Sequence, residues 1–81
     1  MYARINKKAT GERIRLLMIR GGVTVHEVTD ALHLGSVQSV YHWMSGRSLP
    51  TIDNLYALSR LLDVPLEEII CEEDGVRGGK G

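Results

Sequence analysis

The sequence predicts an all-α protein, a compact domain of five short helices within residues 1–71. Apolar residues recur at helical spacing in successive short segments, and glycines or prolines stand between these segments. No segment alternates apolar and polar residues as a half-buried strand does. The 81 residues suffice for one small domain, and with 43% hydrophobic residues and no phenylalanine its core is expected to be mostly aliphatic.

The first helix is expected over residues 7–20. Its apolar residues lie three or four positions apart and therefore share one face: Ile14, Leu17 and Met18. Either Asn6 or Thr10 can cap its start, because both side chains can accept a hydrogen bond from a free backbone amide. The pair Gly21–Gly22 then ends the helix, since glycine readily leaves helical geometry.

The second helix is expected over residues 25–32. Thr24 and Glu27 have the spacing of a capping box, in which the hydroxyl and the carboxylate each accept a hydrogen bond from a backbone amide at the helix start. The expected core residues of this helix are Val28 and Leu32. The segment His33-Leu-Gly35 breaks the helix and leads into the next one.

The third helix, expected over residues 37–45, has two unlike faces. Ser36 is placed to cap it, and Gly46 ends it. One face is apolar and can be buried: Val40, Trp43 and Met44. The other face carries side chains that form hydrogen bonds without a full charge at neutral pH: Gln38, Tyr41, His42 and Ser45. An exposed stripe of this chemistry fits the edges of DNA base pairs.

Two further helices complete the predicted domain. Thr51 can cap the fourth, over residues 52–62, and Pro50 restricts the loop before it. The apolar face of this helix consists of Ile52, Leu55, Leu58 and Leu62. After the interruption at Asp63-Val-Pro65, a short fifth helix is expected from Leu66 to Cys71, with Pro65 at a position near the start that proline favours.

The net charge is zero, but the charges are unevenly distributed. Residues 1–60 carry eight Lys or Arg and four Asp or Glu, a net of +4, whereas residues 61–81 carry two and six, a net of −4. A basic body is compatible with phosphate binding. Residues 72–81 are mostly charged or glycine, so we expect a disordered acidic and glycine-rich tail.

Several classes of protein and site are not indicated. Cys71 is the only cysteine, which excludes an internal disulfide, and it is expected to be a small apolar side chain in the last helix. The three histidines lack a metal-ligand spacing, so neither a metal nor a cofactor is expected. No catalytic set of residues indicates an enzyme. The absence of a long apolar run favours a cytoplasmic, nucleoid-associated protein.

A set of short motifs follows the expected helices in order. The set consists of Gly11-Glu-Arg-Ile-Arg15, Gly22-Val-Thr24 with Glu27, Val40-Tyr-His-Trp43 with Gly46, Pro50-Thr-Ile-Asp-Asn-Leu55, Ala57-Leu58 and Val64-Pro-Leu-Glu-Glu-Ile69. In this order and spacing it resembles the lambda-repressor/Cro-like, or XRE-type, helix-turn-helix domain of phage and bacterial regulators. The resemblance spans residues 11–70 and implies a five-helix domain whose third helix enters the major groove of DNA.

The resemblance also implies which residues contact DNA. The base-reading positions are Val37, Gln38, Tyr41 and His42. A glutamine amide can bond to two atoms of adenine, and valine can pack on a thymine methyl group. The phosphate-binding positions lie at the start of the second helix and after the third: Thr24, Val25, Ser45, Arg47 and Ser48. Lys7 and Lys8 are equally consistent with a solvated helix start and with contacts to the DNA backbone.

Three features depart from the family pattern. Met18 and Met44 stand where members often have an arginine and a glutamate, so we expect a contact between two methionines in place of a buried ion pair. His33 stands where a turn glycine is usual, so the angle between the second and third helices can differ. Val25 replaces a polar residue, which leaves phosphate binding there to backbone amides.

These features predict a sequence-specific DNA-binding transcriptional regulator of bacterial or phage type, in the first place a repressor. We expect a homodimer on a pseudo-palindromic operator in double-stranded DNA. The apolar residues available for the dimer contact are Tyr56, Leu61, Ile70 and Cys71. Two alternatives stay open: the antitoxin of a toxin–antitoxin pair, whose acidic tail contacts a basic toxin, and a protein-interaction module whose third helix no longer reads DNA.

Overall fold

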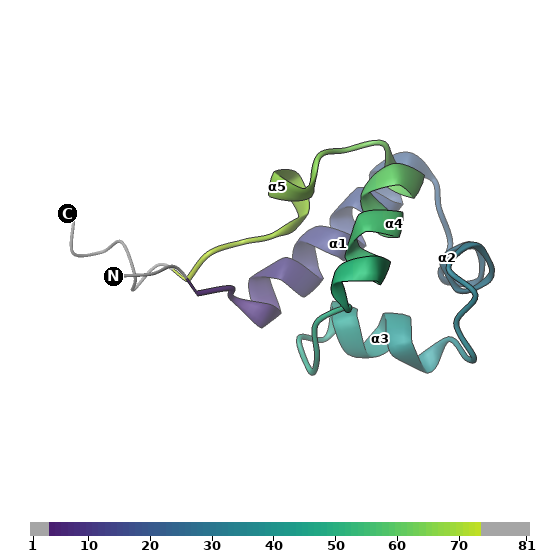
Figure 1. The fold of residues 1–81 in the computed structure, drawn as a ribbon, viewed down its shortest axis with the longest axis horizontal. Helices are drawn as coiled ribbons and strands as arrows, with labels where there is room; N and C mark the ends of the chain where they lie inside the picture. The colour runs from purple at the N-terminus through teal and green to yellow at the C-terminus, as the bar shows by residue number, and fades with distance from the viewer. Residues whose placement is uncertain (1–3, 74–81) are drawn as a thin grey trace.

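The computed structural model describes residues 4–73, which form five α-helices (Figure 1). The helices are α1 Lys7–Gly21, α2 Val25–Ala31, α3 Gln38–Met44, α4 Ile52–Leu62 and α5 Leu66–Ile69. Within these residues the β-type pairing consists of one isolated antiparallel bridge between Ile5 and Glu72. None of the five helices is long and apolar enough to cross a membrane. The predicted all-α class and the order of the five helices are confirmed.

Side-chain caps set the starts of three helices. Asn6, rather than Thr10, caps α1: its Oδ1 accepts a hydrogen bond from the amide of Ala9 at 2.9 Å. At α2 the capping box is complete, because Thr24 Oγ1 accepts from the amide of Glu27 at 3.1 Å and Glu27 Oε1 accepts from the amide of Thr24 at 2.9 Å. Thr51 caps α4 in the same way as Asn6 caps α1.

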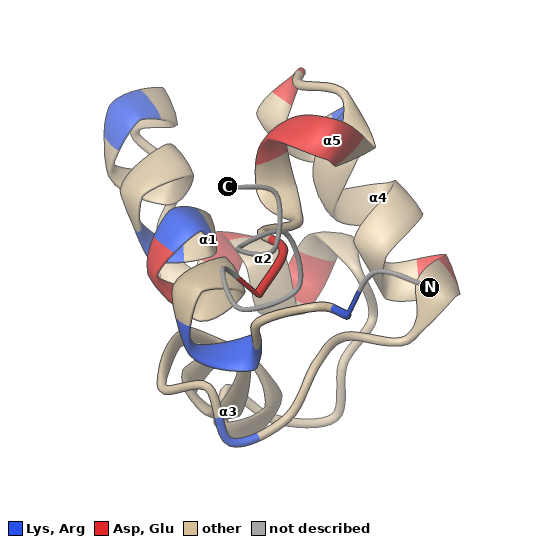
Figure 2. Ribbon diagram, turned by 90° about the vertical axis from the view of Figure 1, so that its left-hand side faces the viewer, with Lys and Arg blue, Asp and Glu red and all other residues tan. Residues whose placement is uncertain are grey.

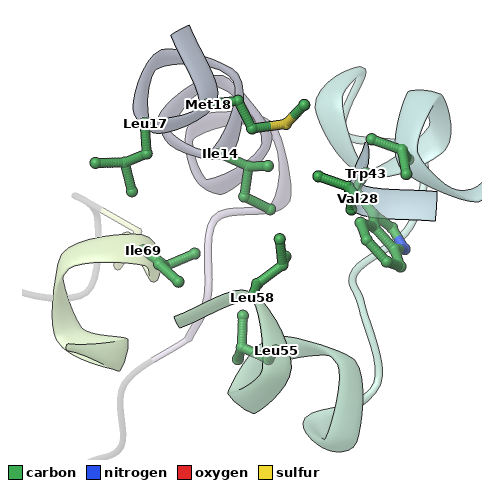
Figure 3. Packing of buried hydrophobic residues seen from close by; sticks show 9 residues of the cluster. Ile14, Leu17, Met18, Val28, Trp43, Leu55, Leu58 and Ile69 are labelled. Atoms are coloured by element: carbon green, nitrogen blue, oxygen red, sulfur yellow. The ribbon is translucent and has the colours of Figure 1, made fainter. Parts of the chain in front are cut away.

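α1 is the central element of the domain. It contacts α3, α4 and α5, and α2 packs against α3 and α4 (Figure 1). The buried apolar side chains come from all five helices: Ile14, Leu17, Met18, Val28, Val40, Trp43, Leu55, Leu58 and Ile69. Figure 3 shows those of α1 directed toward those of α3, α4 and α5. Burial of each large aliphatic side chain contributes about 1.5–3 kcal/mol, which makes this cluster the main source of stability.

For two apolar residues, Ile52 and Met44, the predicted burial or contact is not confirmed. Ile52, assigned to the buried face of α4, is 75% exposed, because it is the first residue of the helix and lies beyond the part that packs on the core. Met44 is half-buried and packs against the core that contains Met18. The proposed contact between these two methionines stays a prediction.

The end of the fifth helix was predicted wrongly. α5 ends at Ile69, and Ile70 has extended backbone geometry, so Cys71 lies outside the helix. The amide of Cys71 donates to Thr10 Oγ1 at 3.0 Å, and its carbonyl accepts from the amide of Asn6 at 2.8 Å. These bonds to the start of α1 replace those of a further helical turn, and they use the hydroxyl of Thr10, which is buried.

The pairing of the two chain ends continues for two residues. Glu72 forms the bridge with Ile5, and the amide of Glu73 donates to the carbonyl of Arg4 at 2.9 Å. Both glutamates belong to the segment 72–81 that we expected to be a disordered tail. The remainder of that segment, residues 74–81, lies outside the described residues.

Candidate nucleic-acid interface

α2 and α3 are joined by a short turn that contains His33. Its φ of 56° places His33 in the left-handed region, which glycine adopts more readily than a residue with a side chain. The amide of His33 donates to the carbonyl of Asp30 at 3.2 Å, and that of Leu34 donates to the carbonyl of Thr29 at 2.9 Å. These bonds close the end of α2, so the turn forms without the glycine that is usual at this position.

The two unlike faces of α3 are confirmed as a buried side and an exposed side. Val40 is 0% and Trp43 is 4% exposed, and both contribute to the core. On the other side Gln38 is exposed, and the large ring of Tyr41 is 52% exposed. His42 and Val37, the other two predicted base-reading residues, are half-buried. The helix therefore presents a polar side while its apolar side anchors it.

At the start of α3 the N-cap position is Val37, which forms no side-chain cap bond, so the prediction that Ser36 is the cap was wrong, although its side chain lies nearby. Ser36 Oγ accepts a hydrogen bond from the amide of Gln38 at 3.2 Å. The helix begins at Gln38 and ends at Met44, one residue inside the predicted bounds at each end. This hydrogen bond from the Gln38 amide to Ser36 Oγ holds the backbone of Gln38, the residue with the greatest capacity to read a base.

At the end of α3 three predicted contact residues gather around the carbonyl of His42. This carbonyl accepts from the hydroxyl of Ser45 at 3.2 Å and from the amides of Arg47 at 2.9 Å and Ser48 at 3.4 Å. The guanidinium of Arg47 also lies 3.4 Å from His42 Nε2. Since an arginine only donates, this contact is a hydrogen bond only in the tautomer whose Nε2 accepts and whose Nδ1 carries the proton. The side chains of Ser45, Arg47 and Ser48 are all exposed.

At the start of α2 the two predicted phosphate contacts differ. The hydroxyl of Thr24 is exposed and accepts from the amide of Glu27, so its own proton remains available for an external acceptor. Val25 is half-buried and packs against the core, so its side chain is directed inward. Val25 can therefore contribute only its backbone amide to phosphate binding, as the replacement of a polar residue by valine at this position implied.

The charged residues are unevenly distributed over the molecule (Figure 2): α1 is mainly basic apart from Glu12, and α5 is acidic. Blue segments lie along α1 and directly after α3, whereas α5 is red. The blue segment after α3 is Arg47, the only Lys or Arg between Arg20 and Arg60. The described residues contain no group of three or more His, Cys, Asp or Glu placed to hold a metal ion.

The apolar residues proposed for a dimer contact are only partly accessible. Tyr56 and Leu61 are exposed, but Ile70 and Cys71 are half-buried. Sequence reasoning missed a second exposed apolar pair, Ile5 and Ile52, which line a crevice of about 130 Å³ with Thr10, Leu49, Pro50, Leu55 and Ile70. The exposure of Ile52 could have been predicted from its position directly after the cap Thr51, because the first residue of this helix lies outside the part that packs on the core.

Comparison with known proteins agrees with this geometry. A family model described as helix-turn-helix matches residues 14–69, well over half of the chain. The chain belongs to the helix-turn-helix family of the XRE type. No curated protein matches it in sequence. At the level of class, this family consists of DNA-binding transcription regulators, and its members' domain has the architecture described above.

Solved structures share the fold at low sequence identity. The controller protein of a restriction-modification system, C.AhdI from Aeromonas hydrophila, is 21% identical with a TM-score of 0.69, over 76% of this chain and 92% of that one. The clp gene regulator ClgR from C. glutamicum is 20% identical with a TM-score of 0.70, over 82% and 84%. The DNA-binding domain of BldD from S. venezulae is 21% identical with a TM-score of 0.68, over 82% and 97%. These likenesses establish the fold of the helix-turn-helix domain.

Proposed function

We propose that this protein is a sequence-specific DNA-binding transcription regulator in which α3 reads base pairs in the major groove. One observation carries the proposal: α3 buries Val40 and Trp43 on its apolar side and leaves a polar, uncharged side exposed at Gln38 and Tyr41. A polar side of this kind matches the donors and acceptors on base edges. Membership of the helix-turn-helix family supports the same placement of the helix.

The reading residues have different roles in this proposal. Gln38 forms two hydrogen bonds with an adenine, and Val37 packs on a thymine methyl group. His42 donates from Nδ1 to a guanine acceptor, which its contact with Arg47 favours. Tyr41 contacts a base or the adjacent phosphate with its hydroxyl. Since Gln38 is the only one of the four that can bond to two base atoms, it carries the largest share of specificity.

The affinity arises mainly from the DNA backbone, because the reading side of α3 has no full charge. The proposed phosphate contacts are Thr24, the amides near Val25, Ser45, Arg47 and Ser48. Arg47 is the only cation among them. Residues 1–71, together with Glu72 and Glu73 that pair with Ile5 and Arg4, form the proposed DNA-binding unit, and residues 74–81 are proposed to be a glycine-rich tail outside it.

The regulator is further proposed to act as a cytoplasmic, nucleoid-associated homodimer that represses transcription. One α3 contacts only a few base pairs, so two copies related by a two-fold axis provide a longer and more selective site. Such a dimer selects a pseudo-palindrome with half-sites about 34–36 Å apart, one turn of DNA. Repression is checked with a reporter gene whose promoter contains that site.

Selection of bound DNA from a random pool tests the proposal. We expect one recurring sequence, with an affinity that falls steeply as the salt concentration rises. On the selected sequence, Gln38→Ala should lose about 1–3 kcal/mol of discrimination at one base pair. Arg47→Ala should weaken binding to all sequences alike and reduce the salt dependence by about one phosphate contact for each subunit bound. Arg20→Ala, which removes an exposed arginine at the far end of α1, is the control.

Other outcomes would contradict parts of the proposal. If Gln38→Ala weakens binding to all sequences equally, Gln38 positions the helix and does not read a base. DNA binding that is absent or insensitive to salt would favour a protein-interaction module instead. A neighbouring reading frame for a toxin-like protein would favour the antitoxin alternative.

A further inference from the structure

The first turn of α1 lies directly against the last turn of α3. A Cβ atom on Gly11 would overlap the carbonyl oxygen of Trp43 and lie 2.9 Å from that of Met44. A Cβ atom on Gly46 would lie 2.8 Å from Lys8 Cα and 3.2 Å from Lys8 N. Lys8 and Gly11 are three residues apart and share one face of α1. We refer to Lys8, Gly11, Gly46 and Arg47 as the α1–α3 junction.

The junction brings together cations from two separate parts of the sequence. Lys8 is in backbone contact with Gly46, and Arg47 is the next residue. Both basic side chains are exposed, as is that of Lys7. Figure 2 shows the blue first turn of α1 beside α3, with the red α5 on another part of the molecule. The only carboxylate on α1 is that of Glu12, one turn further on and also exposed, and the paired Glu72 and Glu73 lie beside Ile5 and Arg4 before the helix begins.

We propose that Lys8 binds a phosphate of the DNA backbone adjacent to the one bound by Arg47. This rests on the proposed function, in which Arg47 meets the backbone where α3 leaves the groove. The Gly46 contact fixes the backbone of Lys8 next to that point, and the flexible stem of lysine lets its ammonium group follow a phosphate as a point charge. The contact carries no base information, but it holds α3 in register on the duplex.

A structural role for Lys8 has to be distinguished from this one. Lys8 also lies beside the carbonyl end of α3, where a positive charge stabilises the helix dipole by about 0.3–1 kcal/mol. That role affects the stability of the free protein and does not depend on DNA. The salt dependence of DNA binding separates the two roles, because it counts the cations released from the duplex on binding.

The test measures binding of the full chain to a 20-bp duplex that contains the selected sequence by fluorescence anisotropy, between about 50 and 200 mM KCl. Lys8→Gln is expected to reduce the slope of log K against log salt concentration by about 0.9 for each subunit bound, the value for one phosphate contact on duplex DNA. Lys8→Glu is expected to weaken binding further through repulsion. Arg20→Gln is the matched control, since Arg20 lies twelve residues along the same helix, about 18 Å away.

Three results would overturn the inference. One is a slope for Lys8→Gln equal to that of the wild type, which refutes the contact while the proposed function stands. Another is an equal reduction of the slope for Arg20→Gln, which indicates that the slope depends on the net charge of the protein and not on a contact at Lys8. The third is a wild-type protein that does not bind the duplex at all, which refutes the proposed function together with the contact. Urea unfolding of each variant confirms that the compared proteins are folded.

Discussion

The two ends of α3 are attached to the domain in different ways. The first end follows a turn in which Ser36 supplies one side-chain hydrogen bond to Gln38, and a Cβ atom at Gly35 would meet nothing within 4 Å. The last end is pressed against α1 by backbone contacts at Gly11 and Gly46. The end that carries the proposed base-reading residue is thus held locally, whereas the end beside Arg47 is held by another helix. Residues at the first end can therefore change with little effect on folding, while those at the last end cannot.

The largest effect is expected from Gly11→Ala. Alanine normally stabilises a helix interior by about 1 kcal/mol relative to glycine, but here the added methyl overlaps the carbonyl of Trp43. We expect a loss of about 3 kcal/mol in the free energy of unfolding, measured by urea denaturation. Gly21→Ala is the control, because its methyl would meet only a side-chain atom of Val23 at 3.7 Å. Equal stability of the two variants would show that the backbones of α1 and α3 are not in close contact at Gly11.

An intermediate effect is expected from Gly46→Ala. Gly46 has a φ of 80°, and Gly22 has a φ of 68°, so alanine at either position incurs the penalty of left-handed geometry, about 1–2 kcal/mol. At Gly22 a Cβ atom meets nothing within 4 Å, whereas at Gly46 it meets the backbone of Lys8 at 2.8 Å. Gly46→Ala should therefore be the less stable variant by about 1 kcal/mol in thermal or urea unfolding. A larger loss of stability for Gly22→Ala than for Gly46→Ala would contradict the close backbone contact between Gly46 and Lys8.

The smallest effect is expected at the first end of α3. Ser36→Ala removes the single side-chain hydrogen bond to Gln38 and should cost about 0.5 kcal/mol. Thr24→Ala provides the comparison, because it breaks a complete capping box and should cost about 1–2 kcal/mol in the same urea experiment. A loss at Ser36 as large as that at Thr24 would mean that the first end of α3 is as firmly capped as the start of α2.

Local signals in the sequence predicted most of the fold. Thr24, Thr51 and Gly22 act on residues within one turn, so the bounds that they set were predicted within one residue. The buried side of α3 was predicted because a period of 3.6 residues places Val40 and Trp43 together. Helical spacing also predicted which residues of α3 are exposed, but exposure alone does not show what a side chain binds. The DNA-binding roles of these residues were therefore inferred from the resemblance to the family.

Features that depend on distant segments were not predictable in this way. The end of α5 was wrong because Cys71 bonds to Asn6 and Thr10, and no local pattern indicates that pairing. The position of Lys8 beside Gly46 also depends on segments that are distant in the sequence. One signal for it was present: Gly11 stands within a helix, where glycine is unfavourable unless another backbone approaches closely.

The pairing of the chain ends has a consequence for biosynthesis. Three hydrogen bonds join the segment 71–73 to the segment before and at the start of α1: Asn6 to Cys71, Cys71 to Thr10 and Glu73 to Arg4. The partners in the Cys71–Thr10 bond are 61 positions apart. On a ribosome, α1 emerges before the other four described helices, yet its start acquires these bonds only after residue 73 has left the exit tunnel. The start of α1 is thus completed by residues that are synthesised after all five of these helices.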